Sequence, residues 1–94
     1  MARRKKLSAI ADALNTSLGP EWVETSALRW SRVTECASFY LNLKRGPSLE
    51  FVRETAVGDV WASSLPIRLE TIDVVKALVN TGVEDTLAEM GYIT

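Results

Sequence analysis

The chain has 94 residues, of which 47% are hydrophobic and 24% charged, so it is long enough for one domain with its own core and too apolar to remain unfolded. A single cysteine excludes an intrachain disulfide, and the absence of histidine removes the commonest general base and metal ligand. The net charge of −1 is unevenly spread: residues 1–6 hold four basic side chains, whereas residues 70–94 hold five acidic ones and one lysine.

The first predicted element is a helix whose apolar stripe starts at Leu7 and which ends before Gly19-Pro20; residues 3–6 either precede this helix or begin it. Its apolar residues recur at helical spacing and form one stripe: Leu7, Ile10, Ala11, Leu14 and Leu18. Positive charge at a helix N-terminus opposes the helix dipole, so residues 1–6 are predicted to be a flexible basic arm ahead of one domain over 7–94. Polar residues interrupt any signal-peptide run, and no stretch approaches the roughly 20 apolar residues of a membrane span. We therefore expect a cytoplasmic protein with no membrane partner.

Residues 22–34 fit either a strand or a short helix, because their apolar positions match both spacings. Residues 37–44 alternate cleanly between apolar and polar side chains, which is typical of a strand with one buried face. Residues 45–48 form a turn, and a second alternating strand follows. Matching the apolar faces predicts that Leu43 pairs with Leu49 and Leu41 with Phe51.

Gly58-Asp59 predicts a two-residue type II′ hairpin, followed by a returning strand; Pro66 either ends this strand or lies at a sheet edge. Further on, Ile72, Val75, Leu78 and Val79 mark a second helix, and Gly82 is predicted to follow its last turn. Thr81 with Glu84 resembles a capping box that begins a short last helix. The predicted class is therefore α+β: an antiparallel meander of three or four strands, with an N-terminal helix and two C-terminal helices on one face.

The sequence offers no pair of groups for catalysis. Cys36 has no histidine to activate it, and the neighbouring Glu35 disfavours a thiolate. Glu50 and Glu54 would lie about 13 Å apart on one strand, which is too far for an acid–base pair. We therefore predict a protein that is not an enzyme and that uses no cofactor and no metal.

Two surfaces are candidates for binding another protein. Trp30 stands between Arg29 and Arg32, and tryptophan and arginine are enriched at interface hot spots. Core packing is the alternative for this tryptophan. Tyr40 and Lys44 would extend this patch over the sheet. The second candidate is the acidic face of the C-terminal helices, formed by Glu84, Asp85 and Glu89.

A nucleic-acid-associated regulator is the first alternative. Its contacts would be the basic side chains of the arm, Arg3, Arg4, Lys5 and Lys6. The net negative charge of the rest of the chain opposes this reading. A homo-oligomeric structural subunit is the second alternative, because an exposed strand over 60–65 can pair across a two-fold axis.

The leading hypothesis is a small non-catalytic protein-binding module whose partner is unidentified. It rests on a chain with the composition of a folded core and with no motif for chemistry. In type and size, although not in particular residues, the chain resembles small accessory proteins of phages and mobile elements. That resemblance implies an inhibitor that acts by occluding a host protein.

Overall fold

The computed structural model describes the backbone of residues 2–91 and the side chains of residues 7–91. Two helices flank five strands in the order α1 (Ala2–Ser17), β1 (Val23–Ser26), β2 (Arg29–Val33), β3 (Ala37–Lys44), β4 (Ser48–Thr55), β5 (Val60–Pro66), η1 (Leu69–Thr71) and α2 (Ile72–Glu89), where η1 is a single 3₁₀ turn. The predicted α+β class is confirmed, with more strands and fewer helices than expected.

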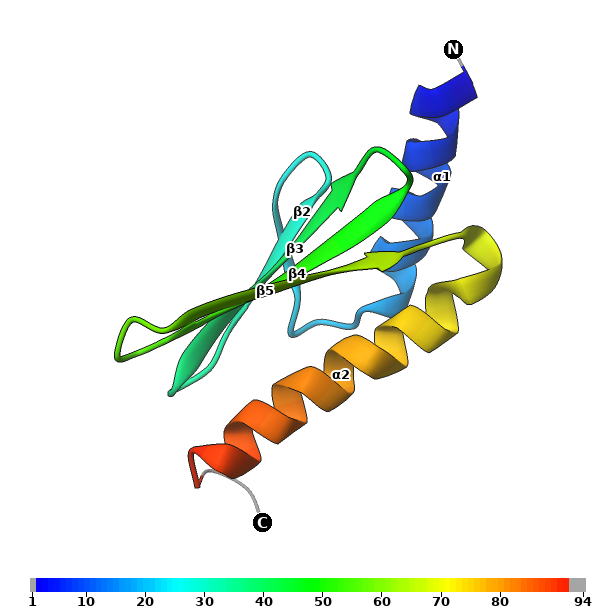
Figure 1. Cartoon of the computed structure of the whole chain (residues 1–94). Coiled ribbons are helices and arrows are strands. Elements are labelled where there is room, and N and C mark those ends of the chain that lie inside the picture. Colours follow the sequence, from blue (N-terminus) through cyan, green and yellow to red (C-terminus); the bar gives the residue numbers. More distant parts are fainter. Residues whose placement is uncertain (1, 92–94) are drawn as a thin grey trace.

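The five strands form one antiparallel sheet in the order β1-β2-β3-β4-β5, a meander in which each strand pairs with the next (Figure 1). The predicted β3–β4 register is confirmed, with Leu43 opposite Leu49 and Leu41 opposite Phe51. Alternate residues of β3 are buried, as a strand with one covered face requires. Both helices pack on that covered face, and the buried side chains of helices and sheet form one core.

The ambiguous stretch over 22–34 is a hairpin of two short strands, β1 and β2. The turn between them contains no glycine. Instead Leu28 takes a positive φ of 63°, a conformation that is uncommon for a non-glycine residue. The Leu28 carbonyl accepts a hydrogen bond of 2.8 Å from the Leu43 amide, which ties the turn to β3. The strand alternative is therefore correct, and the helical alternative is wrong.

The turn between β4 and β5 differs from the predicted two-residue type. The Gly58 amide donates to the Thr55 carbonyl at 2.9 Å, and the Thr55 amide donates to the Asp59 carbonyl at 2.9 Å. These bonds define a three-residue loop over 56–58, with Gly58 at the positive-φ position that follows a type I turn. The predicted type II′ turn is therefore wrong. Gly58 is needed as the third residue of the loop, where φ is positive.

The predicted pair of C-terminal helices is wrong, because α2 continues without a break from Ile72 to Glu89. Gly82 lies inside this helix and does not cap it. A Cβ atom at Gly82 would sit 2.7 Å from Cε2 of Phe51, so glycine lets the helix approach the sheet closely. The Thr81–Glu84 capping box is therefore not a helix start.

The helix α1 begins at Ala2, so the backbone of residues 3–6 belongs to the helix, which was one of the two predicted alternatives. The side chains of Arg3, Arg4, Lys5 and Lys6 lie outside the described side chains, so the flexible basic arm stays a prediction. No helix in the portion of the chain that the structure covers is long and apolar enough to cross a membrane.

Candidate protein interface

The structure separates the residues of the first predicted binding surface. Trp30 is 1% exposed and lies in the core, where its Nε1 donates a 2.6 Å hydrogen bond to Oδ1 of Asn15 in α1. The core alternative therefore holds for Trp30, and this residue is removed from the candidate surface. Arg32 points to the helix side of the sheet, where it lines a shallow hollow with Lys76 and Glu84.

Arg29, Tyr40 and Lys44 do lie together, on the face of the sheet opposite the helices. We call this surface the open face. The guanidinium carbon of Arg29 lies 5.1 Å from the centre of the Tyr40 ring. On the same face Nζ of Lys44 is 3.2 Å from Oε2 of Glu50. Lys44 and Glu50 thus offset each other's charge on this face.

Glu50 is the best-defined charged group of the open face. Contact with the Lys44 ammonium, and then a 3.1 Å hydrogen bond from the side-chain amide of Asn42, lower its pKa from the usual 4.5. The carboxylate is therefore held in its charged form by neighbours on its own surface. Such mutually paired polar groups are typical of the solvated side of an antiparallel sheet.

The three acidic residues of the second predicted surface do not form one patch. Glu84 lines the hollow beside Arg32, on the side of α2 that faces α1. Asp85 and Glu89 instead border a groove of about 210 Å³ between α2 and the sheet, opposite Arg53 and Trp61. The acidic residues therefore divide between two flanks of the same helix.

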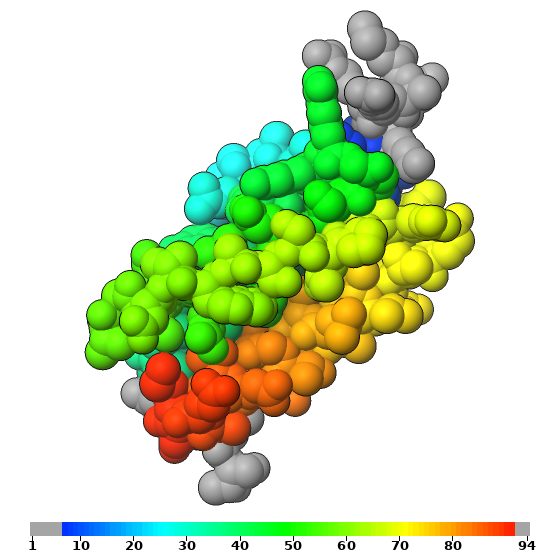
Figure 2. Space-filling model, viewed as in Figure 1, coloured from blue at the N-terminus to red at the C-terminus, as the bar shows by residue number. Residues whose placement is uncertain are grey.

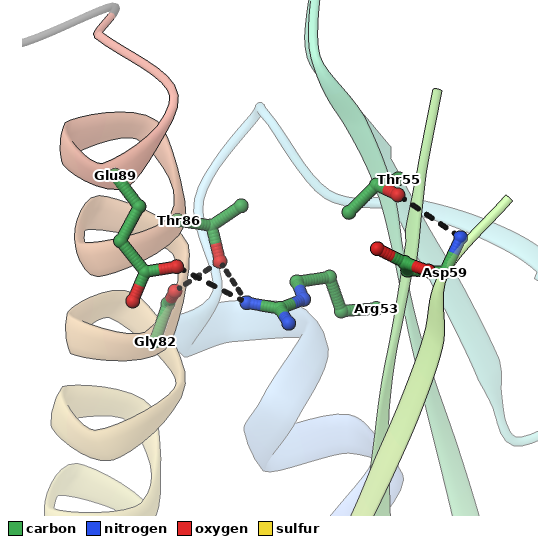
Figure 3. A network of polar contacts seen from close by, with 6 residues as sticks. All are labelled: Arg53, Thr55, Asp59, Gly82, Thr86 and Glu89. Carbon is green, nitrogen blue, oxygen red and sulfur yellow. Dashed lines mark hydrogen bonds and ion pairs between the residues drawn. The ribbon is translucent and has the colours of Figure 1, made fainter. Parts of the chain in front are cut away.

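Arg53 of β4 forms the floor of that groove and joins the sheet to the end of α2 (Figure 3). Its Nη1 donates a 3.2 Å hydrogen bond to Oγ1 of Thr86 and lies 3.9 Å from Oε2 of Glu89. The Thr86 hydroxyl in turn donates to the Gly82 carbonyl at 3.0 Å. The Arg53 guanidinium also lies 5.9 Å from the centre of the Trp61 ring. Arg53 therefore contacts both α2, through Thr86 and Glu89, and the edge strand β5, through Trp61.

The backbone of β5 forms one border of the sheet. The pairs Thr55–Asp59 and Pro47–Ile67 are both hydrogen-bonded and both keep the β4–β5 register. Hydrogen-bonded and non-bonded pairs alternate in an antiparallel ladder. The amides and carbonyls of Val60, Ala62 and Ser64 must therefore point away from β4. We call this row of outward backbone groups the β5 edge.

Side chains beside the β5 edge are unusually apolar for a surface. Trp61 is 48% exposed although it packs edge-on against Phe51, with ring centres 5.9 Å apart. Gly82 borders the same groove as Trp61, and Leu78 and Val74 lie one and two helical turns before Gly82 on α2. These two residues are 52% and 60% exposed. With the half-buried Leu65 they form what we call the apolar border: Trp61, Leu65, Val74 and Leu78.

Sequence reasoning noted the strand over 60–65 as able to pair, but it did not select any of its residues. A signal was present, since Val60 to Ile67 is a run of eight residues without a charge. Such a run fits a buried strand as well as an exposed one, and the sequence alone does not show that β5 is at the edge.

Cys36 is buried, and its sulfur lies 3.8 Å from Oγ1 of Thr34. Within residues whose placement the structure describes, no group of three histidine, cysteine, aspartate or glutamate residues is arranged to hold a metal ion. No family model, no curated protein and no solved structure matches the chain.

Proposed function

We propose that this chain is a non-catalytic protein-binding module that binds its partner by strand addition at β5. The observation that carries the proposal is the β5 edge itself. Three outward amides and three outward carbonyls stand on an exposed seven-residue strand with no charged side chain. Unpaired backbone groups of this kind template the addition of another strand, and neighbouring side chains provide specificity.

The opposite border of the sheet supports the proposal by contrast. β1 has only four residues, includes Glu24, and shifts register between Glu24 and Ser26. Short length, charge and irregular pairing are the usual devices that keep a strand edge from accepting another chain. β5 has none of these devices before Pro66 at its end. One edge is thus protected and the other is left available.

The open face is a weaker candidate for the same function. Its central charged groups already contact each other, as the Lys44–Glu50 and Asn42–Glu50 contacts show. A partner would have to compete with these contacts, whereas the β5 edge offers groups that are unpaired within the sheet. In this proposal Tyr40 and Arg29 make at most secondary contacts with the partner.

Nothing in the described side chains favours the nucleic-acid alternative. Arg29 and Lys44 lie on the open face beside Glu50, Arg32 lies on the helix side, and Arg53 faces Glu89 in the groove. A nucleic-acid surface needs several cations on one face without interspersed carboxylates. The basic residues of the predicted arm remain the only basis for that hypothesis. Occlusion of a host protein and a cytoplasmic location also stay predictions.

A pull-down with matched variants tests the proposal. The full chain, Ala62→Lys and Thr25→Lys are each tagged and incubated with lysate of the source cell, with and without nuclease. Ala62→Lys places a charge on the β5 edge, whereas Thr25→Lys places the same charge on β1. We expect the wild type and Thr25→Lys to retain a protein partner, which can be another protein or an untagged copy of the chain. Ala62→Lys should not retain it. Equal retention by Ala62→Lys, or retention that nuclease abolishes, would overturn it.

A further inference from the structure

We infer that the partner of the β5 edge is a second copy of this chain, paired antiparallel about a two-fold axis at Ala62. This inference rests on the proposed function, since it names the strand that β5 accepts. Figure 2 looks onto the side concerned, where the yellow-green β5 runs beside the orange α2. Charge, backbone register and side-chain size each favour this pairing.

Charge favours a second copy over an unrelated strand. In a two-fold pairing the residues at the axis lie next to their own copies, so a charge there would lie beside an identical charge. Like charges directly opposite each other destabilise a strand pair. β5 carries no charged side chain along its seven residues, so no such repulsion opposes its self-pairing. A different partner strand that carried charged side chains would find no opposite charge on β5.

Backbone register fixes the position of the axis. With Ala62 opposite the partner's Ala62, Val60 lies opposite the partner's Ser64, and Ser64 lies opposite the partner's Val60. All three outward residues of the β5 edge then fall in hydrogen-bonded pairs. Shifting the axis to Ser63 would place Val60 opposite the partner's Pro66, which has no amide hydrogen to donate. Shifting the axis to Trp61 would leave Ser64 opposite Gly58 of the partner, beyond its strand.

Side-chain size agrees with the same register. On the helix side Trp61 lies opposite the partner's Ser63, so a bulky residue meets a small one at both equivalent positions. Trp61 also comes diagonally next to the partner's Trp61, within the reach of aromatic rings. An axis at Trp61 would instead set the two indoles directly opposite each other in the closest kind of pair.

Sedimentation velocity over a range of concentrations tests the association. The wild type and Thr25→Lys should shift from monomer to dimer as the concentration rises. Ala62→Lys should weaken dimerisation by up to about fivefold, because it sets two ammonium groups on opposite sides of the axis. A wild-type chain that stays monomeric at the highest concentration, or a dimer that Ala62→Lys leaves unchanged, would overturn the inference.

Cysteine pairs test the register independently, in a Cys36→Ala background that removes the native thiol. Under mild oxidation Ala62→Cys should cross-link with itself, because hydrogen-bonded antiparallel pairs have Cα atoms about 5.5 Å apart, within disulfide range. Ser64→Cys should not, since its two copies would be about 13 Å apart along the strands. Mixing Ser64→Cys with Val60→Cys should restore the cross-link. Self-linking of Ser64→Cys as fast as that of Ala62→Cys would contradict this register.

The two proposals fail in different ways. If the chain is monomeric in sedimentation but still loses another captured protein on Ala62→Lys, self-pairing is wrong and strand addition at β5 stands. If the wild type dimerises and Ala62→Lys dimerises equally well, self-pairing at β5 is wrong. If Ala62→Lys also retains every captured protein, strand addition at β5 is wrong as well.

Discussion

Gly82 of α2 lies directly against the ring of Phe51 in β4, where a Cβ atom would come within 2.7 Å of Cε2. The Phe51 ring is itself held on two sides. It stacks on Phe39 with centres 5.9 Å apart, and Trp61 packs edge-on against it at the same separation. The ring therefore has little room to move, and the missing side chain at residue 82 sets how closely the helix approaches the sheet.

Gly82→Ala should destabilise the protein even though alanine is the better helix former. The added methyl group overpacks the Phe51 contact at a cost of about 1–3 kcal/mol, which exceeds the gain of about 1 kcal/mol in helix propensity. Thr81→Ala is the control, because Thr81 is exposed on the same helix and should gain a few tenths of a kcal/mol. Urea unfolding measures both. A Gly82→Ala variant as stable as Thr81→Ala would contradict the close packing.

Asn15→Ala should lower the free energy of unfolding by about 1–3 kcal/mol, because it leaves the buried Nε1 of Trp30 without its acceptor. Asn15→Asp keeps an acceptor oxygen in the same place and should retain most of the stability. Thermal or urea unfolding of the two variants distinguishes them. Equal losses in both would mean that the hydrogen bond to Trp30 contributes nothing.

Acidification should destabilise the protein partly through Glu50. Its pKa is lower in the folded state than in the unfolded chain, so the unfolded state binds its proton first as the pH falls below about 4.5. The stabilisation is present above that pH and is lost as the pH drops through the folded-state pKa. Lys44→Ala removes the main cause and should move the Glu50 pKa back toward 4.5, as an NMR titration of the carboxyl carbon would show. High salt should weaken the effect, because the pair is partly exposed.

Alternation in the sequence was enough to predict the centre of the sheet. Ala37 to Lys44 and the strand after it have one apolar and one polar face, and a one-residue slip would have buried polar groups. The β1–β2 hairpin was not predicted as such because its turn uses Leu28 at positive φ, where sequence rules look for glycine or asparagine.

The predicted end of the second helix at Gly82 was wrong because a tertiary contact, which the local sequence does not show, explains this glycine. Gly82 has the appearance of a helix end, and only the distant contact with Phe51 explains its place inside the helix. The candidate site depended on tertiary position in the same way. Trp30 and Trp61 are both on strands, yet Trp30 is central and covered by α1, whereas Trp61 is on the edge. The hydrophobic pattern of a single strand does not show whether that strand lies inside the sheet or at its edge.

Trp61 should report association through its fluorescence. Trp22 and Trp30 are buried in the single chain, whereas Trp61 is half exposed, so acrylamide should quench mainly Trp61. Pairing through β5 covers this indole, and quenching of the wild type should therefore decrease as the protein concentration rises. Trp61→Phe should show no such dependence. Wild-type quenching that is independent of concentration, in a range where a dimer forms, would place the interface elsewhere.

Hydrogen exchange of individual β5 amides tests strand addition most directly. The amides of Trp61, Ser63 and Leu65 face β4 and should exchange slowly at every concentration, whereas those of Ala62 and Ser64 face outward and should exchange quickly in dilute protein. On association, the Ala62 and Ser64 amides should become protected while those of β1 do not change. Fast exchange at Ala62 and Ser64 in the fully associated protein would contradict strand addition at β5.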